Sequence, residues 1–183
     1  LFDPTYSNAR AFSENMAAVE TFDGWIYINE KGEEVITPTF QISSAREFSE
    51  GFAAVQTVEG WGYINSSGEL KITPKYRDAG RFTDGRAWVR DGDYIGYIDK
   101  EDDMIIEPQF SDAKSFSENM AAVRLNSDWF FVSRKSNLIT ITDPFNEAES
   151  FVNGISRVTL GEDENTRYGY INKKGDYVWF PTK

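Results

Sequence analysis

Residues Gly60–Pro74 read GWGYINSSGELKITP, and residues Gly24–Pro38 read GWIYINEKGEEVITP. Both stretches contain an aromatic run, a polar turn that ends in glycine, and a second run that ends in proline. All six prolines of the chain occupy this last position, at intervals of 34, 36, 34, 36 and 37 residues: Pro4, Pro38, Pro74, Pro108, Pro144 and Pro181. The spacing predicts a tandem repeat of about 35 residues.

A second landmark is a phenylalanine that opens segments such as EFSEGFAAV, and it fixes the expected boundaries of the repeats. The repeats are predicted at residues 12–47, 48–81, 82–115, 116–150 and 151–183, and residues 1–11 form a partial repeat. Because the chain begins within a repeat, we expect it to be part of a larger protein.

Each repeat holds three short runs that alternate with period two and are rich in Val, Ile, Tyr and Trp, which predicts three β-strands. Asn65-Ser-Ser-Gly68 predicts a tight hairpin with positive φ at Gly68, and Asp102 takes the glycine's place in the third repeat. Pro74 and its equivalents are expected to end the third strand because proline cannot donate a ladder hydrogen bond.

These patterns predict an all-β fold: an open array, or solenoid-like stack, of five three-stranded antiparallel repeats plus one partial repeat. The alternative is a β-propeller or part of one. Propeller blades usually have four strands, so a three-stranded repeat favours the open array.

The alternation also predicts the faces of each strand. In the first run Ala53 and Val55 are small and recur in other repeats, which indicates the core, whereas the face of Phe52 and Ala54 varies and is expected to be partly solvated. Gly62 and Gly96 in the second run indicate a close approach of neighbouring backbone.

The amino-acid composition excludes or disfavours several classes of function. There is no cysteine and no histidine, so thiolate metal sites and the commonest general base are excluded, and we expect no metal, no cofactor and no catalytic residue. The net charge of −11 disfavours nucleic acid as a partner, and no apolar run is long enough for membrane insertion. Localisation cannot be read from the sequence.

Recurring carboxylates give no sign of a catalytic pair. The acidic residue after Phe-Ser is interpreted as a turn residue that accepts backbone N–H groups, and it recurs as Glu14, Glu50, Asp84 and Glu118. The acidic clusters Asp99–Asp103 and Glu162–Glu164 do not match a calcium-binding loop and are interpreted as solvated turns.

Aromatic residues recur on one face of the second run and predict a ladder through the stacked repeats. Its members are Trp25, Tyr27, Trp61, Tyr63, Tyr97, Trp129, Phe131, Tyr168 and Tyr170. We interpret the ladder as packing between repeats; the alternative is a surface for sugar rings or choline-like cations.

The third repeat carries the most individual feature. Arg86, Trp88 and Arg90 lie on one face of a strand, and other repeats have Ala or Arg at the position of Trp88. A tryptophan between two arginines has the composition of a protein-binding hot spot. The alternative is a tryptophan that fills a local gap between arginine stems.

In its FSEG-A-A-V, WGYIN and ITP-x-F elements, the chain resembles the WG-repeat family, tandem β-repeats of bacterial proteins. The resemblance implies a noncatalytic module, often part of a larger multidomain protein, and names no ligand. We therefore expect a module for protein–protein binding or scaffolding, whose partner is another protein or a neighbouring domain of the same chain. The alternative is a glycan- or cell-wall-binding module.

Overall fold

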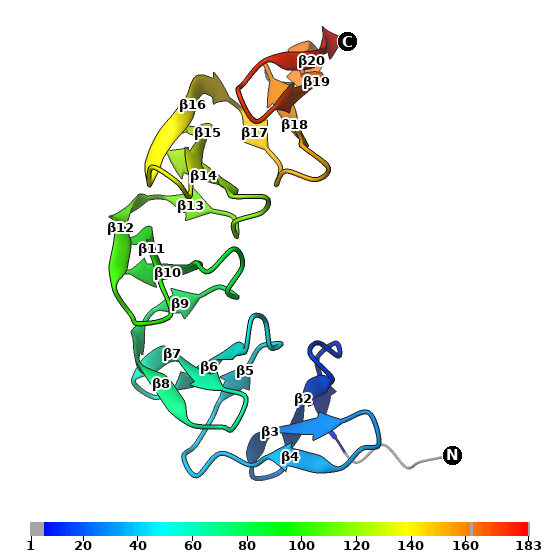
Figure 1. Cartoon of the computed structure of the whole chain (residues 1–183), viewed down its shortest axis with the longest axis vertical. Coiled ribbons are helices and arrows are strands. Elements are labelled where there is room, and N and C mark those ends of the chain that lie inside the picture. The colour runs from blue at the N-terminus through cyan, green and yellow to red at the C-terminus, as the bar shows by residue number, and fades with distance from the viewer. Residues whose placement is uncertain (1–5, 162, 183) are drawn as a thin grey trace. The chain divides into compact units, whose positions relative to one another are not determined.

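The computed structural model describes residues 6–161 and 163–182 as an all-β chain (Figure 1). The strands form five four-stranded antiparallel sheets. A short 3₁₀ turn at Asp163–Asn165 is the one helical element in the described ranges, where no helix is long and apolar enough to cross a membrane. Leu1–Thr5 with Pro4, and Glu162 of the second acidic cluster, lie outside these ranges.

The chain divides into two compact units, which we describe separately. The N-terminal unit comprises residues 6–82 and 100–102. Its first sheet has the order β1 (Asn8–Ala9), β2 (Met16–Thr21), β3 (Gly24–Asn29) and β4 (Glu34–Ile36). Its second sheet has the order β5 (Ser44–Ala45), β6 (Phe52–Thr57), β7 (Gly60–Asn65) and β8 (Leu70–Tyr76), and β9 (Asp78–Ala79) follows.

The C-terminal unit comprises residues 83–99 and 103–182. Strands β10 (Ala87–Asp91), β11 (Tyr94–Ile98) and β12 (Met104–Phe110) pair in sequence order. The next sheet contains β13 (Asp112–Ala113), β14 (Met120–Leu125), β15 (Asp128–Ser133) and β16 (Leu138–Phe145). The last contains β17 (Glu147–Ala148), β18 (Ile155–Leu160), β19 (Arg167–Asn172) and β20 (Tyr177–Thr182).

The all-β fold is confirmed, but the expectation of three strands per repeat is wrong. A fourth strand of two residues, such as Ser44–Ala45, pairs with the strand that opens the next predicted repeat. Two residues are too short to show an alternating pattern, so this strand is invisible to periodicity. A four-stranded unit is the size of a propeller blade, which removes the argument that favoured the open array.

The predicted hairpin turns are confirmed. Gly68 has φ +81°, and Asn65 Oδ1 accepts hydrogen bonds from the backbone N–H of Ser67 (3.1 Å) and Glu69 (2.9 Å). Asp102 adopts φ +69° in the third repeat, and Asp99 Oδ1 accepts from the N–H of Asp103 (2.9 Å). The side chain of Asn or Asp therefore closes the turn.

The expectation that proline ends the third strand is wrong in most repeats. Strand β8 passes through Pro74 to Tyr76, which pairs with Trp61, and the register shifts between this pair and Tyr63↔Ile72. Because the strand has a bulge at this point, the proline is not required to donate a ladder hydrogen bond.

This bulge explains the nearby glycine. A Cβ at Gly62 would lie 2.3 Å from Ile72 O and 2.7 Å from Pro74 N, which confirms the predicted close approach of backbone.

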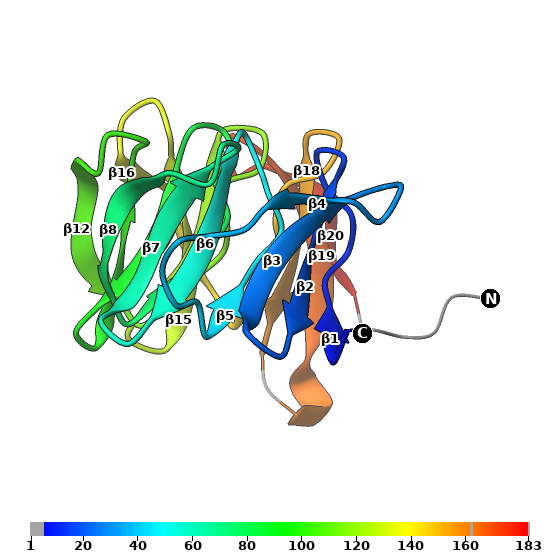
Figure 2. The same cartoon turned by 90° about the horizontal axis from the view of Figure 1, so that it is seen from below.

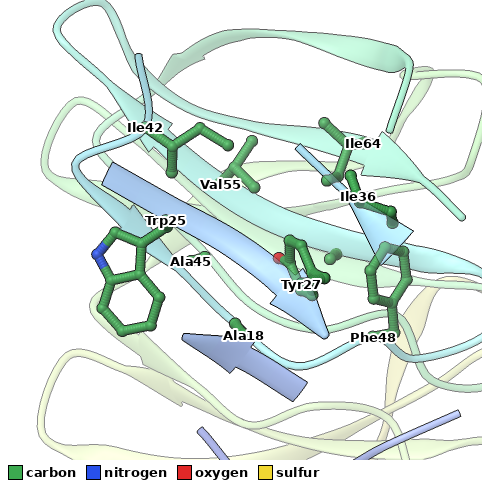
Figure 3. Close-up of a cluster of buried hydrophobic side chains, with 10 residues drawn as sticks. Ala18, Trp25, Tyr27, Ile36, Ile42, Ala45, Phe48, Val55 and Ile64 are labelled. Atoms are coloured by element: carbon green, nitrogen blue, oxygen red, sulfur yellow. The ribbon is translucent and has the colours of Figure 1, made fainter. Parts of the chain in front are cut away.

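The predicted partly solvated face of the first run is confirmed at some positions, such as Ile155 (38% exposed), and wrong at the recurring alanines. Ala18, Ala54 and Ala122 on that face are as buried as Ala17 and Val55 on the other. In the N-terminal unit, Figure 2 shows β2 and β3 beside the sheet of β5–β8, and Figure 3 shows Ala18 and Tyr27 packed with Val55 and Ile64 of that next sheet. An inner sheet of a stack is covered on both faces, so alternation alone cannot identify a solvent face.

Candidate binding surfaces

The aromatic ladder lies mostly between sheets. Its members in the first four repeats are all buried: Trp25, Tyr27, Trp61, Tyr63, Tyr97, Trp129 and Phe131. Lysine or arginine side chains lie over several of the rings. For example, Arg46 Cζ lies 4.6 Å from the centre of the Trp61 ring. In the last repeat Tyr170 is half-buried and Tyr168 is exposed, so there the ladder reaches the surface.

Tyrosine hydroxyls of the second run bind the chain just after the next two-residue strand. Each donates to a main-chain carbonyl there: Tyr27 to Arg46 O (2.9 Å), Tyr63 to Gly80 O (2.6 Å) and Tyr97 to Lys114 O (2.7 Å). Burial raises the pKa of all three hydroxyls well above the usual range for tyrosine.

The recurring acidic turn residues join repeats. They accept backbone N–H groups, as predicted, but from the turn of the next repeat: Gly51 N to Glu14 (3.0 Å), Asn119 N to Asp84 (2.6 Å) and Gly154 N to Glu118 (2.9 Å). The hydrogen bond from Lys173 is the main cause that lowers the pKa of Glu118. These carboxylates are therefore engaged in structure.

The predicted hot spot lies at the start of β10: Arg86 directly precedes this strand, and Trp88 and Arg90 lie on it. Trp88 is half-buried against the apolar cluster that contains Tyr97 and Phe116. Arg90 donates to Asp93 O (3.0 Å) and Ser111 O (3.5 Å), and the buried Nε of Arg86 has no acceptor among the described residues. The three side chains share a face of one strand, and each is partly covered.

Metal ligands do not gather in the described ranges, where no group of three His, Cys, Asp or Glu side chains could hold an ion. Two members of the first acidic cluster have structural roles instead: Asp99 closes its turn, and Asp102 pairs with Lys75.

A surface that the sequence analysis missed lies in the N-terminal unit, where the connection from β4 to β5 carries two extra residues. Ile42 takes the position that Tyr76 has in the next repeat, and it is 2% exposed within the core cluster (Figure 3). Phe40, which the sequence pattern matched to Tyr76, is displaced to a half-buried position. The signal of this insertion was the step of seven residues from Pro38 to Ala45, against five from Pro74 to Ala79.

Two adjoining hollows flank the displaced segment, with volumes of about 540 and 270 Å³. Phe40 and Leu70 line both, and we call the whole the apolar groove: Val35, Phe40, Val58, Leu70 and Pro74. The charged residues among its lining are Glu59 and Glu69, and none of the lysines or arginines in the described part of the chain lines it.

Exposed apolar hairpin tips adjoin this groove. Val58, at the tip between β6 and β7, is 99% exposed and lines the smaller hollow. Phe22, at the equivalent tip between β2 and β3, is 103% exposed. Gln41 Nε2, from the groove wall, donates to Asp23 O beside Phe22 (3.3 Å).

Comparison with solved structures places the fold among β-propeller-like proteins. The chain is similar to Hsv2p of Kluyveromyces lactis, with a TM-score of 0.60, 11% identity, and coverage of 94% of this chain and 62% of that one. It is also similar to a eukaryotic initiation factor, with a TM-score of 0.61, 10% identity, and coverage of 92% and 52%. The chain thus spans little more than half the length of these structures, and the propeller alternative gains support.

The fold therefore defines a tandem β-repeat module. The family model of the WG-containing repeat matches residues 1–24, 25–59, 61–94 and 95–129, and the chain belongs to this family. The four-stranded pattern continues beyond the matched residues in β16–β20. No curated protein matches the chain.

Proposed function

We propose that the chain is a noncatalytic interaction module, and that its N-terminal unit binds an extended apolar segment of another protein in the apolar groove. The observation that carries this proposal is a fully exposed valine, Val58, at the lip of a groove that is lined by Phe40 and Leu70. Exposed apolar side chains beside a hollow are typical of protein interaction sites.

Charge indicates which segment fits. Glu59 and Glu69 are the charged lining residues, and the whole chain carries a net charge of −11. A segment with lysine or arginine beside its apolar anchors would approach favourably, whereas an acidic segment would be repelled.

The absence of catalysis rests on the chemistry of the residues present. The chain has no histidine or cysteine, and the recurring carboxylates Glu14, Asp84 and Glu118 hold the turns of neighbouring repeats. Groups committed to backbone hydrogen bonds in three repeats are poor candidates for acid–base work.

The test is a displayed library of random dodecapeptides, selected on the wild-type chain. We expect the enriched peptides to combine apolar and basic residues and to lose binding to Val58→Asp and Phe40→Ser variants. Leu138→Ser is the matched control, because Leu138 is an exposed apolar residue (66%) elsewhere on the chain. Enriched peptides that bind both groove variants as tightly as the wild type would contradict the proposal, as would self-association that the groove variants abolish.

The strand with Arg86, Trp88 and Arg90 is a second candidate contact because it differs from all other repeats. Its test is the same selection with Trp88→Ala and Arg86→Ala variants, and unchanged peptide binding would remove it.

A further inference from the structure

A polar cleft lies between the sheets of β13–β16 and β17–β20, within the C-terminal unit. It consists of two adjoining cavities of about 150 and 440 Å³. Glu147 and Thr159 line both cavities, Lys114 and Trp129 line the smaller one, and Tyr168 lines the larger one.

An ion pair that joins two repeat positions in the N-terminal unit is absent at the equivalent positions in this cleft. There, Arg46 Nη2 and Asp78 Oδ1 are 2.7 Å apart. Lys114 and Glu147 occupy the same repeat positions, and neither forms an ion pair with any residue in the described ranges. Lys114 Nζ lies 5.5 Å from the centre of the Trp129 ring, and Arg46 likewise lies over the Trp61 ring.

Thr159 is a second point at which this cleft differs from the equivalent positions of other repeats. The position of Thr159 holds Gln56, Arg90 and Arg124 in three preceding repeats, so a short side chain replaces long ones. Thr159 is 8% exposed and lines both cavities. A short side chain thus lines the cleft at a position where three other repeats carry a long one.

The lining presents both signs of charge. Lys114, Arg124 and Arg157 are cationic, and the acidic lining residues are Asp128, Glu147, Glu149 and Asp163. Arg157 forms an ion pair with Glu149, and its Cζ lies 5.5 Å from the centre of the Tyr168 ring. A strongly charged ligand of either sign would meet like charges along this wall.

We infer that this cleft binds a neutral, polyhydroxylated ligand, namely a short oligosaccharide. Each sugar hydroxyl both donates and accepts, so it can accept from the Lys114 ammonium and donate to the Glu147 carboxylate. Tyr168, 47% exposed at one end, offers an aromatic ring to the apolar face of a sugar. Together the two cavities fall in the size range of small-molecule sites.

The test uses the full chain and three neutral probes, cellotriose, maltotriose and chitotriose, by titration calorimetry up to about 10 mM. We expect at least one probe to bind. Thr159→Gln should abolish that binding, because it restores the side chain that the second repeat carries at Gln56. Glu147→Gln should weaken binding about tenfold through the loss of one charged hydrogen bond.

Asp78→Asn is the matched control, because Asp78 is the counterpart of Glu147 in the N-terminal unit, and it should leave the affinity unchanged. Circular dichroism confirms that each variant is folded. Binding of none of the three probes, equal binding to Thr159→Gln, or tighter binding of the charged dipeptide Lys-Glu than of any probe would overturn the inference. This test is independent of the apolar groove, since Val58→Asp should not affect it.

Discussion

In two neighbouring repeats, the main-chain carbonyl at the same repeat position accepts a hydrogen bond from different side chains. In the third repeat Tyr97 donates to Lys114 O (2.7 Å), and Ala121 stands nearby on the next sheet. In the fourth repeat the tyrosine is replaced by Phe131, which has no hydroxyl. There Ser156, at the position equivalent to Ala121, donates to Glu149 O (2.7 Å).

We predict that Phe131 and Ser156 form a compensated pair. Ser156 is 1% exposed, so Ser156→Ala would leave the Glu149 carbonyl without this buried donor and lower the free energy of unfolding by about 1–2 kcal/mol. Phe131→Tyr in the same chain restores the combination of the third repeat. The double variant should therefore recover about 1 kcal/mol of that loss.

The reciprocal exchange is the matched control. Tyr97→Phe removes the hydrogen bond to Lys114 O and should lower the free energy of unfolding by about 1–2 kcal/mol, and adding Ala121→Ser should restore much of it. Urea unfolding gives these free energies, followed by circular dichroism and tryptophan fluorescence so that coincident transitions verify two-state behaviour. Strictly additive effects in both cycles would refute the reasoning.

Three further predictions concern the buried tyrosines, Glu118 and the bulge beside Gly62. The pKa of buried Tyr27, Tyr63 and Tyr97 is raised above the unfolded value of 10.0, so the unfolded state loses protons first. The free energy of unfolding should therefore be unaffected below pH 10 and should fall above it by about 1.4 kcal/mol per pH unit for each tyrosine. The Tyr97→Phe variant should lose stability less steeply, because it has one buried hydroxyl fewer. Urea titrations at alkaline pH that give the same slope for the variant and the wild type would contradict this. Glu118→Gln should lower the urea midpoint at neutral pH and make no difference in acid. The pKa of Glu118 is lowered in the folded state, so its contribution to stability is lost as pH falls through that pKa. A difference between variant and wild type that persists at about pH 2 would argue against a stabilising role of the Glu118 carboxylate. Gly62→Ala should destabilise by more than about 3 kcal/mol, because its Cβ would meet backbone at 2.3 Å, and a near-neutral effect in thermal melts would show that the bulge can move.

Much of the architecture could be read from the repeat. The prolines and the Phe-Ser turns marked the units, the alternating runs marked three strands of each, and Gly68 and Asp102 marked hairpins whose backbone φ values are positive. The glycine at position 62 was correctly assigned to a close backbone approach. These features succeed because turn geometry and strand alternation depend on residues close in sequence.

The candidate surfaces were harder to predict from the sequence. The longer step from Pro38 to Ala45 signalled an insertion, but only the structure shows that Ile42 enters the core and that Phe40 is half-buried. The fourth strand was missed because two residues have no period, although the alanine that recurs in it, such as Ala45 and Ala79, was a visible signal.

The sequence alone determined the repeat, its turns and most of its strands, since each is set by local backbone preferences. The tertiary structure decided what covers each face and which side chains of successive repeats meet. Arg46 and Asp78 close into an ion pair whereas Lys114 and Glu147 do not, although the two pairs occupy the same repeat positions. That difference depends on the packing of sheets against one another, and the pattern of a single repeat does not encode it.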